Sequence, residues 1–118
     1  MKRRHLEAQI QRAIVQYLSI FEKQGKLFFF AIPNQGGRGL EKRGAMLKAM
    51  GVKSGAPDLV ILIPPSTAAF IEIKSPSGRL STAQIATAQI LMGAGFQFET
   101  VRSLDDMTSR LKTWGVVK

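Results

Sequence analysis

The segment DLVILIPPSTAAFIEIK, residues 58–74, decides how this chain folds. Short apolar runs bounded by turn residues are typical of strands, and we expect strands at 58–63 and 68–74. Pro64-Pro65-Ser66 lies between them and predicts a turn. The segment is therefore predicted to form an antiparallel hairpin.

Charged residues stand only at the ends of this hairpin. Asp58 opens the first strand, and Glu72 and Lys74 close the second. Because residues i and i+2 of a strand point to the same face, Glu72 and Lys74 project together, whereas Ile71 and Ile73 project to the other face. Two carboxylates at neighbouring strand ends can hold a hard divalent cation, and a lysine beside them can stabilise an anion. Hydrolysis of a phosphodiester requires this combination.

Each of these charges also has an ordinary explanation. Pro57-Asp58 is a common turn element, and alternation alone would place Glu72 and Lys74 on a solvent-facing edge. Against this, the run Ile61-Leu62-Ile63 on the opposite strand predicts a sheet buried on both faces. Charges on such a sheet need partners or a metal, which favours interpretation as a site.

The rest of the chain alternates helices and strands around the hairpin. Apolar periodicity and turn residues predict helices at 5–24, 40–50, 81–93 and from Ser103 onward, and strands at 27–32 (buried) and 96–101. We expect a single domain over residues 1–118, with an α/β fold in which helices flank a mixed sheet of about four strands. Residues expected to face inward include Leu6 and Ala13 in the first helix, Leu40, Leu47 and Met50 in the second, and Leu104, Met107 and Leu111 in the last.

The composition limits which classes of partner and which metals the protein can use. The 118 residues carry a formal net charge of +9, so we expect a polyanionic partner, foremost nucleic acid, over a merely basic soluble domain. The chain has no cysteine and a single histidine, His5. This suits a reducing cytoplasm and leaves oxygen ligands for any metal, which points to Mg²⁺ or Mn²⁺. No apolar run has the length of a membrane span, so the protein is expected to be soluble and cytoplasmic.

Several short motifs occur in a fixed order along the chain. They are Pro33-Asn34-Gln35-Gly36-Gly37-Arg38, Gly55-Ala56-Pro57-Asp58, Glu72-Ile73-Lys74, Gly78-Arg79-Leu80-Ser81 with Gln84, and Val101-Arg102-Ser103. The set resembles the VRR-NUC nucleases of the PD-(D/E)xK superfamily, in particular the stand-alone members of phages and bacteria. The resemblance extends from about Glu7 to about Leu111 and implies a restriction-endonuclease-like core.

The resemblance also assigns roles at the catalytic site. It implies that Asp58, Glu72 and the carbonyl of Ile73 bind the metal, and that Lys74 orients the attacking water and offsets charge on the transition state. A glutamate of the first helix contributes to the metal site in this family, and Glu7 occupies that position beside the apolar stripe. An acid near a helix N-terminus is also favoured by the helix dipole alone.

Gln84 has two explanations at this stage. The family places a glutamine here beside the lysine of the motif, and Gln84 shares a helix face with Ala88, Leu91 and Gly95, which would turn it toward the sheet. Alternatively, Ser81 and Gln84 form a capping box in which each side chain satisfies the backbone N–H of the other.

Basic residues next to the motifs are candidates for DNA contact. Arg38, Lys42 and Arg43 follow or adjoin the glycine-rich loop, whose backbone can approach phosphates closely, and Lys53 and Arg79 adjoin the two halves of the motif. A basic helix face is, however, often only solvated.

The expected function is metal-dependent, structure-specific endonuclease activity on DNA. By resemblance we expect branched DNA as the substrate, foremost four-way Holliday junctions, because no sequence-reading module fits in so short a chain. Symmetrical cuts favour a homodimer, joined through the segment with Trp114, Val116 and Val117 or through an exposed face of the flanking helices. A flap, nicking or restriction-type nuclease and a non-catalytic DNA-binding module remain the alternatives.

Overall fold

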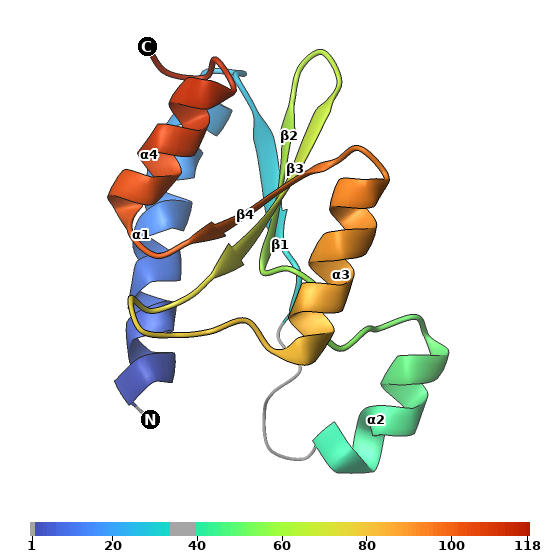
Figure 1. Ribbon diagram of the computed structural model, residues 1–118. Coiled ribbons are helices and arrows are strands. Elements are labelled where there is room, and N and C mark those ends of the chain that lie inside the picture. Colours follow the sequence, from blue (N-terminus) through green and yellow to red (C-terminus); the bar gives the residue numbers. More distant parts are fainter. Residues whose placement is uncertain (1, 34–39) are drawn as a thin grey trace.

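The computed structural model describes residues 2–33 and 40–118 and has the predicted α/β architecture (Figure 1). Helices and strands alternate along the chain much as the sequence pattern indicates. In chain order the elements are α1 (Lys2–Lys23), β1 (Phe28–Ala31), α2 (Leu40–Ala49), β2 (Leu59–Ile63), β3 (Thr67–Ile73), α3 (Thr82–Gly93), β4 (Gln97–Val101) and α4 (Leu104–Thr113).

The sheet is mixed, with strand order β1-β2-β3-β4. The predicted hairpin is confirmed, since β2 and β3 pair antiparallel with Leu59 opposite Ile71. β1 also pairs antiparallel with β2, whereas β4 runs parallel to β3, with Ile73 opposite Val101. A parallel partner requires a crossover connection, and α3 provides it between β3 and β4.

The main core lies on one face of the sheet, beneath α1 and α4 (Figure 1). Alternate residues of the central strands point into it, together with one stripe of each helix. The largest fully buried side chains include Ile14 and Leu18 of α1, Leu59 and Ile61 of β2, Ile71 and Ile73 of β3, Val101 of β4, and Met107 and Leu111 of α4. Asp58, Glu72 and Lys74 belong to the opposite face, where α3 packs along β4.

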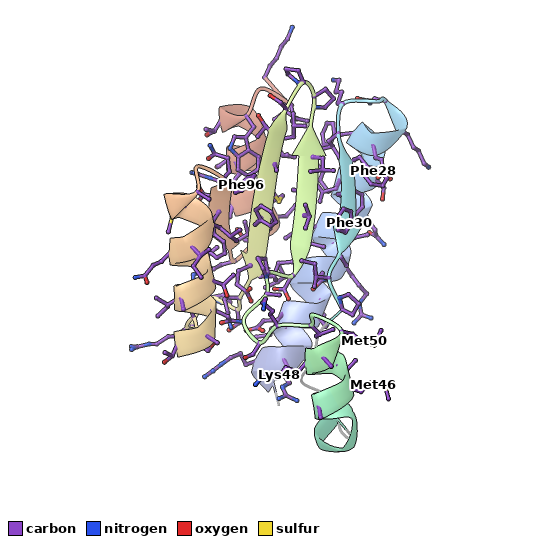
Figure 2. All side chains as sticks on the ribbon, turned by 90° about the vertical axis from the view of Figure 1, so that its right-hand side faces the viewer. Phe28, Phe30, Met46, Lys48, Met50 and Phe96 are labelled. Carbon is purple, nitrogen blue, oxygen red and sulfur yellow. The ribbon has the colours of Figure 1, made fainter. Side chains whose placement is uncertain are left out.

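The prediction of a sheet buried on both faces holds for most of β2, where Val60 is buried, but is wrong for β1 and for Leu62 of β2. Strand β1, predicted to be buried, lies at the edge of the sheet, and its Phe28 and Phe30 are 57% and 45% exposed. Their neighbour on β2, Leu62, is exposed as well. α3 lies over β4, on the other side of this face, and no helix of the described part covers Phe28 or Phe30 (Figure 2).

Other residues expected to face inward are exposed, namely Leu6 and Ala13 of α1 and Leu104 of α4. Helix α1 has 22 residues and is about 33 Å long, whereas the seven residues of β3 span about 23 Å. Leu6 lies in the overhanging part, and Leu104 lies in the first turn of α4. Helix α2 stands at the periphery, where Met50, just beyond its end, is 73% exposed and Leu47 is half-buried (Figure 1).

Among residues 2–33 and 40–118, no helix combines the length and the apolar character needed to cross a bilayer.

Candidate active site

The two carboxylates at the ends of the β2–β3 hairpin meet in one cavity of about 380 Å³. Asp58, Glu72 and Gln84 line it, and so does Glu7, which reaches it from α1. The remaining walls come from Ile32 and Pro33, from the segment Lys53–Ala56, and from Ser81. Four of the residues proposed for catalysis, distant in sequence, are therefore brought together.

Asp58 is fixed by the sheet immediately before β2. Its backbone N–H donates to the Ile71 carbonyl at 2.9 Å, and its carbonyl accepts from the Ile32 N–H at 2.8 Å. Its carboxylate Oδ2 accepts from the Ile73 N–H at 2.7 Å, beside the end of β3. The rigid Pro57, itself buried, limits the approach of the chain to this point. The carboxylate of Asp58 consequently lies next to the Glu72–Lys74 motif.

Glu72 is buried, with 3% of its surface exposed. One carboxylate oxygen, Oε2, accepts from Gln84 Nε2 at 2.9 Å. The other oxygen, Oε1, is buried and has no hydrogen-bond partner among the described residues. Leaving a buried polar oxygen unpaired is costly, so this atom is the one available to an additional ligand.

Both carboxyl groups have raised pKa values. Burial is the main cause for Glu72, and the adjacent Asp58 carboxylate adds to it, so that the pKa of Glu72 rises to about 8. Burial also raises the pKa of Asp58, although the hydrogen bond from Ile73 opposes it. A divalent cation between the two groups would stabilise both ionised forms. The oxygen donors and the unpaired Glu72 Oε1 fit such an ion.

Gln84 makes both kinds of contact that the sequence left open. Its backbone N–H donates to Ser81 Oγ at 3.1 Å, and its Oε1 accepts from the Ser81 N–H at 2.8 Å, which completes the capping box of α3. Its Nε2 remains free to donate to Glu72. The amide thus contacts the glutamate of the motif, whereas the resemblance placed it beside the lysine.

Glu7 lies at the rim of the cavity. Its Oε2 accepts from the Ser75 N–H at 3.2 Å, in the loop after β3. Its negative charge contributes to the raised pKa values of Asp58 and Glu72, so it is electrostatically part of the site. Within residues 2–33 and 40–118, however, no three acidic, histidine or cysteine side chains are close enough to hold a metal as they stand. The role of Glu7 as a ligand stays a prediction.

Lys74 is half-buried just beyond β3, and its backbone N–H donates to the Val101 carbonyl at 3.1 Å. Its ammonium group lowers the pKa of Asp58 and of Glu72, opposing the larger effect of burial. Lys74 is not among the residues that line the cavity. It therefore lies beside the carboxylates without closing the pocket over them.

The proposed DNA contacts are only partly described. Lys53 is exposed and lines the cavity, and Arg79 is exposed in the loop before α3. Lys42 and Arg43 belong to helix α2, but their side chains lie outside the described part, as does Arg38 altogether.

Two features of the site are not evident from the sequence. Gly55 approaches the first turn of α3 so closely that a Cβ there would lie 2.5 Å from the Ala83 carbonyl oxygen. Arg102 reaches across from the end of β4 to the loop after β3. Both residues belong to recognisable motifs. Their contacts, however, join segments 24–28 positions apart, and no local sequence pattern predicts contacts of this kind.

The fold and the cavity define a class of protein: an α/β domain with carboxylates at the ends of adjacent strands of a mixed sheet. Comparison with known proteins identifies the family. Residues 4–105 match the VRR-NUC domain, and the chain belongs to the VRR-NUC family. This membership implies a nuclease.

Solved structures agree on the fold. The chain is similar to a protein described as a VRR_NUC domain protein, with a TM-score of 0.71, 21% identity, and coverage of 92% of this chain and 86% of that one. It is also similar to a structure described as a VRR_NUC domain, with a TM-score of 0.61, 19% identity, and coverage of 92% and 95%. No curated protein matches the sequence.

Proposed function

We propose that this protein is a metal-dependent endonuclease that cuts branched DNA, foremost four-way junctions. The observation that carries the proposal is the buried Glu72 carboxylate, which has one oxygen held by Gln84 and the other unpaired beside Asp58. A cation would complete this arrangement, because a buried carboxyl oxygen without a partner is costly. The formal charge of +9 adds the attraction to DNA that a small nuclease needs.

Asp58 and Glu72 would hold Mg²⁺ or Mn²⁺, with the Ile73 carbonyl and Glu7 as further oxygen donors. When bound, the cation would polarise the phosphate and lower the pKa of a bound water. Gln84 occupies Glu72 Oε2 and so leaves Oε1 for this task. Lys74, close enough to influence both carboxyls, orients the attacking water and offsets negative charge as the bond to the 3′ oxygen breaks.

Lys53 and Arg79 are suited to contact the DNA backbone, together with Arg38, Lys42 and Arg43. Lys53 supports this most directly, because it is exposed and lines the same cavity as the two carboxylates. A phosphate drawn to Lys53 would lie at the mouth of the site. Contacts of this kind position the substrate without reading its sequence, which is consistent with recognition of DNA shape.

Cleavage of a junction on both sides requires two sites, and we propose that a second copy of this chain supplies the other. The surface proposed for the contact consists of Phe28 and Phe30 (Figure 2) and of Leu62, which is paired with Phe28, and is here called the open face. Copies with a net charge of +9 repel each other, and no charged residue occurs between Leu27 and Gly37 or between Leu59 and Ile71. β1 is also an edge strand, and although the Phe29 N–H already donates to Glu22 Oε2 at 3.2 Å, the edge is open to a second copy about a two-fold axis.

The C-terminal segment, the other interface expected from the sequence, packs partly on the monomer itself. Val116 is buried in the core of the monomer, and Trp114 and Val117 pack against that core. Trp114 and Val117 are half-buried and keep part of their surface exposed, so this segment stays an alternative interface for the same experiment to test. The open face, by contrast, is uncovered and apolar.

The decisive experiment for the activity is cleavage of a panel of labelled substrates: a four-way junction, a flap, a splayed duplex and a linear duplex. Each is incubated with Mg²⁺, with Mn²⁺ and with chelator. We expect metal-dependent cutting of the junction in preference to the linear duplex. Preference for the flap would identify a different nuclease, and binding without cutting under every condition would identify a non-catalytic module.

Light scattering at micromolar concentration, with and without junction DNA, tests the dimer. Phe30→Arg should yield a monomer, whereas Leu104→Arg, at an exposed position on α4 beyond the other face of the sheet, should not change the mass. A wild-type monomer in both conditions would exclude the dimer.

A further inference from the structure

Arg102, just after β4, makes several hydrogen bonds. Its guanidinium Nη1 donates to the carbonyl oxygens of Ser75 at 2.7 Å and Gly78 at 2.6 Å, with that of Pro76 at 3.4 Å. Its own backbone N–H donates to Asp106 Oδ2 at 2.9 Å, in the first turn of α4. One side chain therefore ties the loop 75–78 to the junction of β4 and α4.

The loop 75–78, which follows β3, contacts Glu7. The Ser75 N–H donates to Glu7 Oε2, and the loop is closed by a 3.0 Å bond from the Gly78 N–H to the Ser75 carbonyl. Gly78 is packed so tightly that a Cβ there would lie 3.1 Å from both Glu7 Oε2 and Ser75 Oγ. The position of the loop thus defines where the Glu7 carboxylate can lie.

Glu7 depends on this support. Its side chain is long and flexible, it starts from the overhanging end of α1, and its hydrogen bond in the described part of the chain is the one to Ser75. A carboxylate with so few constraints would occupy several rotamers unless its partner were held in place. Arg102 holds Ser75 in place by donating hydrogen bonds to the carbonyls at both ends of the loop, those of Ser75 and Gly78.

We propose that Arg102 is a positioning residue for the metal site: it fixes the loop 75–78, and through the Ser75 N–H and the Gly78 backbone it sets Glu7 against the cavity. The inference rests on the proposed function, because it assigns Glu7 to the metal. It adds a residue that directly follows β4 to a site otherwise built around α1, β2, β3 and α3. Groups that orient a ligand in this way typically change metal affinity by about 10- to 100-fold.

The test compares Arg102→Ala with Arg110→Ala. The control removes the same charge from nearby α4, where Arg110 forms a partly exposed ion pair with Glu99 at 3.4 Å that contributes little to stability. Amide hydrogen exchange on the metal-free proteins should show the Ser75 N–H exchanging at least about tenfold faster in Arg102→Ala alone. Calorimetric titration with Mn²⁺ should give an affinity about tenfold or more weaker in that variant. Arg102→Lys should recover part of both losses.

A double-mutant cycle with Glu7→Gln then separates positioning from general damage. If Arg102 acts through Glu7, adding Arg102→Ala to Glu7→Gln should weaken Mn²⁺ binding no further. Additive losses, or an Arg102→Ala protein that binds Mn²⁺ like wild type, would overturn the inference. If Arg102→Ala does not fold, Gly78→Ala disturbs the same contact from the loop side and must produce the same loss.

These measurements also separate the inference from the function. A wild-type protein that neither binds Mn²⁺ nor cuts DNA refutes the proposed nuclease site, and with it the role of Arg102. A wild-type protein that does both, with unchanged Mn²⁺ affinity in Arg102→Ala, refutes the role of Arg102 alone.

Discussion

Gly55→Ala tests whether the approach of α3 to the chain before β2 builds the active site. Gly55 has φ +86°, and its Cβ position lies 2.5 Å from the Ala83 oxygen, where real Cβ atoms come no closer than 3.0 Å. Alanine therefore requires a movement of at least about 0.5 Å, the difference between these distances. That movement falls on the first turn of α3, next to Gln84. The 2.9 Å bond from Gln84 to Glu72 would be stretched or broken.

The energy can be divided into a backbone part and a contact part. Alanine in the left-handed region costs about 1–2 kcal/mol, and forcing a Cβ into an occupied space costs about 1–3 kcal/mol more. Gly95→Ala is the matched control, because Gly95 has φ +91° and nothing within 4 Å of its Cβ position. We therefore expect Gly95→Ala to lose about 1–2 kcal/mol and Gly55→Ala about 2–5 kcal/mol of unfolding free energy.

Urea denaturation measures the stability, and single-turnover cleavage under conditions where each variant is folded measures the site. Displacement of a catalytic group by about 1 Å can cost 100-fold in rate, so a shift of half that size should lower the rate by about tenfold or more. The control should cut DNA at the wild-type rate. If Gly55→Ala loses no more stability than Gly95→Ala and keeps its cleavage rate, the contact with Ala83 does not organise the site.

Three further predictions concern the carboxylates and the basic residues. Asp58→Ala or Glu72→Ala should abolish cleavage with the fold kept, because each removes a ligand and also relieves repulsion; more than a tenth of the wild-type rate in saturating Mg²⁺ would contradict the assignment. In the metal-free protein, the pKa of Glu72 is about 8 when folded and near its ordinary value of 4.5 when unfolded. Unfolding between these pH values therefore releases a proton, so stability should fall as pH rises, by at most about 1.4 kcal/mol per pH unit, and denaturation curves of Glu72→Gln should lack this slope. Replacing Arg38, Lys42 and Arg43 together by alanine should reduce the dependence of log K on log salt by about 0.9 for each phosphate that the variant can no longer neutralise, and an unchanged slope would indicate a solvated helix face.

The elements governed by local chemistry were predictable from the sequence. The β2–β3 hairpin follows from its apolar runs and its proline turn, and Ser81 and Ser103 cap the helices as their motifs indicate. The gathering of Asp58 and Glu72 at one end of the sheet also follows, since it depends only on hairpin register. These features are decided by residues close in sequence.

Features that depend on the arrangement of whole elements were not predictable in this way. The apolar run at Phe28–Ala31 has the pattern of a buried strand, but its burial depends on strand order and on which strands a helix covers. The inward direction predicted for Met50 is wrong because helical spacing gives a direction and not the presence of a neighbour. The sequence could not decide whether Gln84 caps α3 or contacts the site, because the same position on the helix suits both interpretations.

The hydrophobic core and the acidic site lie on opposite faces of the sheet. The largest buried side chains lie between the sheet and helices α1 and α4, whereas Asp58, Glu72 and Gln84 meet on the other face. Because a buried, partly unpaired carboxylate destabilises the metal-free fold, the core on the first face has to offset that cost. Core and site touch at β3, whose Ile71 and Ile73 anchor the strand while the intervening Glu72 faces the cavity. A change in the core should therefore alter stability well before it alters cleavage, and a change at Glu72 should do the reverse.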